Sequence, residues 1–125
     1  MIITEHIRTV LLVSGAFTLA PIVQLLLPKV GPRLLFGVDP PEGAGGLFTR
    51  HWSLLAPCFG ALLIYAAWHP EIRTPLMAFA AIEKAGLVGF IIADRKKPHA
   101  ARMLPIAIFD SLIVTAYAAY LFQLL

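Results

Sequence analysis

Charged residues are scarce in this chain of 125 residues. Asp, Glu, Lys and Arg together make up 14% of it, whereas about 25% is usual in soluble domains. Hydrophobic residues make up 59%, and the mean hydropathy is +0.83. So few charges exclude an ordinary water-soluble domain, whose surface must be hydrated. We therefore expect an integral membrane protein.

Cysteine is nearly absent as well. The single residue, Cys58, lies in an apolar stretch, which excludes an internal disulfide and a CxxC redox motif. Residues 1–6 lack the basic region of a secretory signal peptide, and the apolar run after them continues to Leu27 without a clean cleavage site. We thus expect no cleavable signal peptide.

Long apolar runs, by contrast, are abundant. Each membrane-spanning helix needs about 20 apolar residues. Four such runs are present, at residues 7–27, 51–68, 75–93 and 103–125. A 24-residue loop, 28–51, follows the first run and is rich in glycine and proline, which is typical of a set of turns. The sequence predicts an all-α fold in which residues 1–125 form a single integral membrane domain, a four-helix bundle.

Tryptophans and prolines mark the ends and bends of the predicted helices. Trp52 and Trp68 bracket the second run at a helical separation of about 24 Å, close to the spacing of two interfacial aromatic belts. Pro21 and Pro57 lie inside the first and second runs, where each removes a backbone hydrogen bond. A kink at either proline opens a pocket or simply bends a packed helix.

Basic residues are distributed unevenly between the two sides of the predicted membrane domain. Loops 28–51 and 93–102 contain seven of them: Lys29, Arg33, Arg50, Arg95, Lys96, Lys97 and Arg102. The opposite side contains Arg8 and Arg73. Because cytoplasmic loops are enriched in Lys and Arg, we expect both loops to be cytoplasmic and both termini to lie outside, in a bacterial inner membrane. The basic loops are expected to contact membrane lipids and no nucleic acid.

Two adjacent charges, Glu83 and Lys84, interrupt the third apolar run. A charge at bilayer depth costs at least about 2.5 kcal/mol on insertion scales, so each needs a partner or a function. Adjacent helical residues project about 100° apart, so these two cannot pair well with each other. Asp110 lies about 12 Å from the basic side of the fourth run, and Lys84 about 15 Å from that side of the third. We therefore predict a Lys84–Asp110 ion pair.

Polar residues of all four predicted helices lie in the same half of the membrane. The expected cluster is Gln24, Arg50, His51, Glu83, Lys84 and Asp110. In a structural interpretation, the Lys84–Asp110 pair fixes the helix register, and Arg50 or Gln24 holds Glu83. In a functional interpretation, the cluster handles a ligand or protons, because titratable groups gathered in a cavity are typical of such sites. Both interpretations are open at this point.

Metal and haem sites find little support. The four histidines all lie at predicted helix ends or in loops: His6, His51, His69 and His99. A carboxylate site using Glu83, Asp110 and His51 has no Glu-x-x-His spacing, and the charge of Lys84 would repel a cation there. We predict no metal site and no cofactor, and the sequence assigns no catalytic residue.

A series of short motifs extends over most of the chain. In order, these are Gly45-Gly46, Arg50-His51-Trp52 opening a helix, Pro70-Glu71-Ile72-Arg73 before the third helix, Glu83-Lys84 within it and Asp110 in the fourth. This order resembles small four-helix membrane proteins of the DoxX-like kind. The resemblance implies a compact four-helix bundle. It also implies a role beside a redox enzyme, because some DoxX-like members are membrane subunits of quinone-linked oxidoreductases.

Three functions are compatible with these features. We prefer a polar pocket that binds an amphipathic ligand such as a quinone or lipid, with Lys84 and Arg50 holding its head and a carboxylate managing protons. The alternative is a non-catalytic accessory or scaffold subunit of a membrane complex, whose small-residue strips bind a partner or a second copy. These strips are Ala81, Ala85 and Gly89, and Ala56 and Gly60. A proton-coupled transporter is disfavoured by the lack of a repeat or a broken-helix pair.

Overall fold

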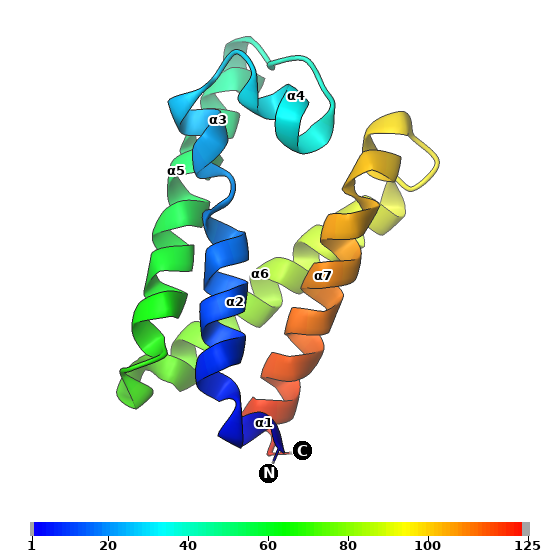
Figure 1. Cartoon of the computed structure of the whole chain (residues 1–125). Helices are drawn as coiled ribbons and strands as arrows, with labels where there is room; N and C mark the ends of the chain where they lie inside the picture. The colour runs from blue at the N-terminus through cyan, green and yellow to red at the C-terminus, as the bar shows by residue number, and fades with distance from the viewer. Residues whose placement is uncertain (1, 124–125) are drawn as a thin grey trace.

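A computed structural model describes residues 2–123, in which the regular elements are all helices (Figure 1). They are α1 (Ile2–Glu5), α2 (Ile7–Leu19), α3 (Ile22–Leu26), α4 (Gly31–Phe36), α5 (Gly43–Ala66), the short 3-10 helix η1 (Pro70–Ile72), α6 (Arg73–Ala93) and α7 (Pro98–Leu121). The last two residues of the predicted fourth run, 124–125, lie outside the described residues. The predicted all-α class is confirmed for the described part of the chain.

Four helical stretches of the described chain are long and apolar enough to cross a membrane. They are Ile7–Leu26, Gly43–Ala66, Pro70–Ala93 and Pro98–Leu121. At 1.5 Å of rise per residue, 20 to 24 residues extend for about 30–36 Å, which matches the hydrocarbon core of a bilayer. The chain therefore has the helices of a membrane protein.

Helix boundaries in the first half of the chain differ from those predicted. The connection is not the predicted 24-residue loop, because α4 lies within it and α5 begins at Gly43 instead of at His51. Gly43, Gly45 and Gly46, which predicted turns, are part of α5. Gly46 donates a backbone hydrogen bond to the carbonyl of Glu42, and a Cβ on Gly46 would lie 2.8 Å from the carbonyl oxygen of Pro41. Glycine is thus needed where this helix starts against the preceding chain.

Proline has different effects in the first and second spans. Pro21, which has no backbone N–H, separates α2 from α3, so the predicted interruption of the first span is present. In the second span α5 remains helical through Pro57. Only the first of the two prolines therefore breaks its helix.

The helices pack as two antiparallel pairs. In Figure 1, α2 runs beside α5 and α6 beside α7, and α6 passes obliquely behind α2. The first pair is close enough for backbone contact, since a Cβ on Gly15 would lie 2.8 Å from the carbonyl oxygen of Gly60, and a Cβ on Gly60 2.6 Å from that of Gly15. Such close approach is what small residues permit between membrane helices.

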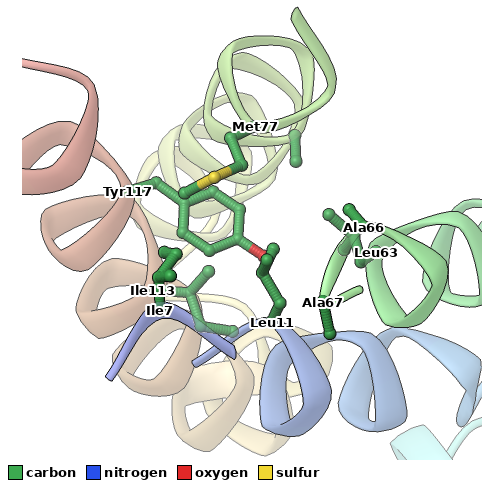
Figure 2. Packing of buried hydrophobic residues seen from close by; sticks show 9 residues of the cluster. Ile7, Leu11, Leu63, Ala66, Ala67, Met77, Ile113 and Tyr117 are labelled. Atoms are coloured by element: carbon green, nitrogen blue, oxygen red, sulfur yellow. The ribbon is translucent and has the colours of Figure 1, made fainter. Parts of the chain in front are cut away.

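The main hydrophobic core lies at one end of the molecule. Leu11, Leu63, Met77 and Tyr117 come from α2, α5, α6 and α7 and extend into one region (Figure 2). The Tyr117 hydroxyl lies 2.5 Å from the Ser14 hydroxyl, which satisfies both buried groups. We call this the α1 end. The opposite end, which we call the basic end, contains α3, α4 and the α6–α7 connection (Figure 1).

Two arginines at the α1 end form hydrogen bonds with the C-terminal end of α5. Arg73 is buried, and its Nε and Nη2 donate hydrogen bonds of 2.8 and 2.7 Å to the carbonyls of Ala66 and Ala67. Arg8 donates a hydrogen bond of 3.2 Å to the carbonyl of Ala67. Both carbonyls lie at the C-terminal end of α5, where cations are favoured, and the Ala66 carbonyl also accepts a backbone hydrogen bond from His69 N–H. The two basic residues on this side thus cap a helix.

Candidate functional site

An interhelical cavity opens between the two helix pairs, in the half of the molecule nearer the basic end. Its volume is about 170 Å³. Every long helix contributes to its wall, and α4 contributes Leu35 and Phe36. Pro21 also lines it, so the break between α2 and α3 lies beside the opening. The wall is largely apolar, apart from Thr18 and three charged residues of α6 and α7.

Two of these charged residues form the predicted ion pair. The Lys84 Nζ lies 3.2 Å from Asp110 Oδ1, and the two residues are 3% and 2% exposed. Lys84 Nζ also lies 5.8 Å from the centroid of the Phe17 ring, within range of a cation–π interaction. The predicted contact between the third and fourth spans is therefore present and almost completely enclosed.

Glu83 is the third charged residue at the interhelical cavity, and its surroundings differ from those of Lys84. It is exposed and lines the cavity wall. Among residues 2–123 no side chain forms a hydrogen bond or an ion pair with it, so the predicted contact with Arg50 or Gln24 is not formed. An accessible carboxylate therefore faces a mostly apolar opening.

Gln24 is buried away from the interhelical cavity. Its Nε2 donates a hydrogen bond of 3.3 Å to the Ser53 hydroxyl, which in turn donates one of 2.6 Å to the carbonyl of Thr49. This chain of hydrogen bonds joins α3 to α5. Gln24 thus stabilises the contact of these helices, and the sequence analysis did not identify Ser53 as its partner.

Arg50 and His51 do not join the predicted cluster. Both are exposed on α5, and Arg50 borders a separate hollow of about 470 Å³ at the start of that helix, together with Lys29. The physical reason is the early start of α5, which places both residues two turns inside the helix and not at its N-terminus. Of the six predicted site residues, the structure brings Glu83, Lys84 and Asp110 together.

Aromatic side chains form a part of the site that the sequence analysis missed. Phe17, Phe36 and Trp52 line the interhelical cavity, and the ring centroids of Phe36 and Trp52 are 6.0 Å apart. Trp52 was interpreted as a membrane-interface marker, yet it is half-buried against the opening. Its spacing of four from Ala56 was an available signal, because residues i and i+4 share a helix face and an alanine there leaves room for a pocket.

Electrostatics at the basic end are dominated by cations that Asp94 partly neutralises. His99 Nε2 donates a hydrogen bond of 3.0 Å to Asp94 Oδ2, and Lys97 Nζ lies 3.4 Å from Oδ1. The hydrogen bond from His99, with a smaller contribution from Lys97, lowers the pKa of Asp94 below its usual value. This carboxylate, just after the end of α6, therefore stays ionised at a lower pH than an unpaired aspartate does.

Metal binding finds no geometric support in the described residues. Within residues 2–123 no three His, Cys, Asp or Glu side chains are placed to hold a metal ion. Comparison of the chain with protein-family models, curated proteins and solved structures finds no match, so the interhelical cavity is interpreted from its geometry.

Proposed function

We propose that the chain binds an amphipathic membrane molecule, such as a quinone or a lipid, in the interhelical cavity. The observation that carries the proposal is the apolar opening between two helix pairs, with Glu83 accessible on its wall and the Lys84–Asp110 pair behind it. Binding pockets for small molecules are typically apolar with a few placed polar groups. Ionisable residues at membrane depth are typical of functional sites.

The size of the interhelical cavity limits what enters it. An apolar cavity of about 150 Å³ accepts one benzene ring, and this one measures about 170 Å³. It therefore suits one ring or one compact head of an amphipathic molecule, and the apolar tail would extend between the helices into the lipid. Glu83 is the accessible group that would meet the head, with the buried Lys84–Asp110 pair beside it, whereas Arg50 lies elsewhere.

We also propose the membrane in which this site lies, its orientation there and the group of proteins to which the chain belongs. The seven basic residues of loops 28–51 and 93–102 support a bacterial inner-membrane location with these loops in the cytoplasm. The motif order that resembles DoxX-like proteins supports membership of that group, and with it a place beside a quinone-linked redox enzyme.

Ligand retention tests the binding function. The protein is purified in a mild detergent, and quinones and lipids that remain bound are identified by mass spectrometry. Ala56→Phe fills the interhelical cavity from α5, whereas Ala61→Phe adds the same side chain to an exposed position of that helix and serves as the matched control. We expect a retained amphiphile in the parent and in Ala61→Phe, and its loss in Ala56→Phe. Equal retention in both variants would contradict the proposal.

A second candidate is the accessory or scaffold subunit. A specific observation favours it: Gly86 and Gly89 of α6 have no atom within 4 Å of an added Cβ, unlike Gly15 and Gly60. Phe90 on the same helix is 74% exposed. This strip would accept a neighbouring helix of a partner or of a second copy. A monomeric protein in native membranes, measured by crosslinking at Gly89→Cys in a Cys58→Ala background, would count against it.

A further inference from the structure

Glu83 is the accessible charge of the interhelical cavity. Lys84 and Asp110 also line it, but they are buried and neutralise each other. Glu83 is exposed, and within residues 2–123 no counter-charge contacts it. An ionised carboxylate in apolar surroundings is stabilised by a cation or by a proton. The interhelical cavity thus contains one carboxylate that a ligand can reach.

The net charge of the interhelical cavity decides which ligand head groups it favours. One ammonium and two carboxylates give the fully ionised site a single excess negative charge. An anionic head, such as a phosphate, would be repelled by this excess. A neutral head would leave Glu83 without a counter-charge, whereas a cationic head would neutralise the site.

The walls of the interhelical cavity suit a cation as well. Phe17, Phe36 and Trp52 come from three different helical segments and line the same opening. Aromatic faces attract cations through the ring quadrupole, and several such faces together are a recurring means of binding quaternary ammonium groups. A volume of about 170 Å³ accommodates a head about the size of one six-membered ring.

We infer that the interhelical cavity selects amphipathic cations, which have an ammonium or pyridinium head of about one ring and an apolar tail. The Glu83 carboxylate meets the positive head, and the aromatic walls enclose it. The inference rests on the proposed function and narrows it, because quinones are neutral and many lipid heads are anionic.

Tryptophan fluorescence gives a direct test. Decylpyridinium, a single-ring cation that quenches indole emission on contact, is titrated into the detergent-solubilised protein. Trp68→Phe leaves Trp52 as the one tryptophan of the chain, at the interhelical cavity. Trp52→Phe leaves Trp68, which lies just beyond the C-terminal end of α5. We expect saturable quenching of Trp52 and only weak, linear quenching of Trp68.

Charge selection is tested in the Trp68→Phe background. Glu83→Gln keeps the side-chain size and removes the charge, so we expect it to lower decylpyridinium affinity by about ten-fold or more. Asp94→Asn removes a carboxylate outside the cavity and should leave the affinity unchanged. Decylbenzene has the shape of the probe without its charge, and it should compete poorly, as should decyl sulfate and a decyl-substituted benzoquinone. These competitors need no variant, so the test does not depend on Glu83→Gln folding.

The outcomes separate the two proposals. Unchanged affinity in Glu83→Gln, or displacement of the probe by the neutral compounds at equal concentration in the micelle, would overturn cation selection and leave the cavity as a binding site. Absence of saturable Trp52 quenching would also overturn cation selection. If, in addition, Ala56→Phe retained as much amphiphile as Ala61→Phe, the proposed function itself would fail.

Discussion

At the scale of single residues, the burial of Lys84 requires Asp110, and the burial of Asp110 requires Lys84. Each charge is almost fully enclosed, and each supplies the counter-charge of the other. Removing one partner leaves an uncompensated buried charge, whereas removing both leaves two groups that can pack as apolar side chains. Substitutions of this pair therefore measure how strongly the two residues depend on each other, and not how much the pair adds to the stability of the protein.

Variants of this pair should behave non-additively. We expect Lys84→Met to lower the free energy of unfolding by about 3–5 kcal/mol, because Asp110 then lacks its cation, and we expect the double variant Lys84→Met with Asp110→Leu to regain most of that loss. Denaturant titrations in one detergent, followed by circular dichroism, measure both. If the losses of the two single variants simply add in the double variant, the residues are not coupled.

The same double variant separates the two interpretations of the charged residues. A folded double variant that still retains its amphiphile would assign the Lys84–Asp110 pair a structural role, with Glu83 as the group that meets the ligand. A folded double variant that has lost its ligand would assign the pair to the binding site as well. Circular dichroism and ligand retention, measured on one preparation, are sufficient for this distinction.

At the scale of helices, the glycines of α5 and α6 have opposite surroundings. Gly60 of α5 contacts the backbone of α2, whereas Gly89 of α6 has open space where a side chain would extend. A methyl group at Gly60 must push two helix backbones apart, since the obstructing atom is a carbonyl oxygen and not a flexible side chain. The small-residue strips of the sequence are therefore used differently: one closes a helix pair and the other remains exposed.

Alanine substitutions should report this difference. We expect Gly60→Ala to lower the free energy of unfolding by about 1–3 kcal/mol through overpacking. Gly89→Ala is the matched control, and it should be neutral or slightly stabilising because alanine favours the helix. Unfolding of both variants in one detergent provides the comparison. Similar stability of the two variants would show that α2 and α5 are not in close contact.

Several elements of the fold could be predicted from the sequence because their causes are local. Four apolar runs define four long helices, since bilayer thickness sets the length of each. The Lys84–Asp110 pair followed from the rise per residue along two antiparallel helices. The first prediction needs only the length of each apolar run, and the second needs only the depth of each charge along its own helix.

Other features depend on contacts between distant segments and could not be predicted. The start of α5 at Gly43 contradicts the low helix propensity of its glycines, and the close approach of Gly46 to Pro41 is a feature of the folded chain that propensity does not contain. That shift of the helix start moved Arg50 and His51 away from the charged residues. The Gln24–Ser53 hydrogen bond depends on how α3 and α5 pack, and hydropathy does not contain this information.

Orientation is a property of the whole molecule. The basic end contains most of the Lys and Arg residues, so we expect it to face the cytoplasm. In a Cys58→Ala background, Glu71→Cys on η1 should react with a membrane-impermeant maleimide in intact cells, and Lys96→Cys should react only after the membrane is disrupted. Reaction of Lys96→Cys in intact cells, without reaction of Glu71→Cys, would reverse the proposed topology.

The main core holds α7 at the α1 end, and at the basic end α7 packs on α6. Near the α1 end Tyr117 is fully buried in the core and hydrogen-bonded to Ser14, whereas Met103, at the interhelical cavity, packs with Ile91 and Ala100 in a second, smaller cluster between α6 and α7. Tyr117 and Met103 are about 21 Å apart along the helix, so a rotation of about 5° at Tyr117 displaces the far position by about 2 Å. A tilt of this size, made by α6 and α7 together, therefore changes the width of the opening by more than a carbon–carbon bond length.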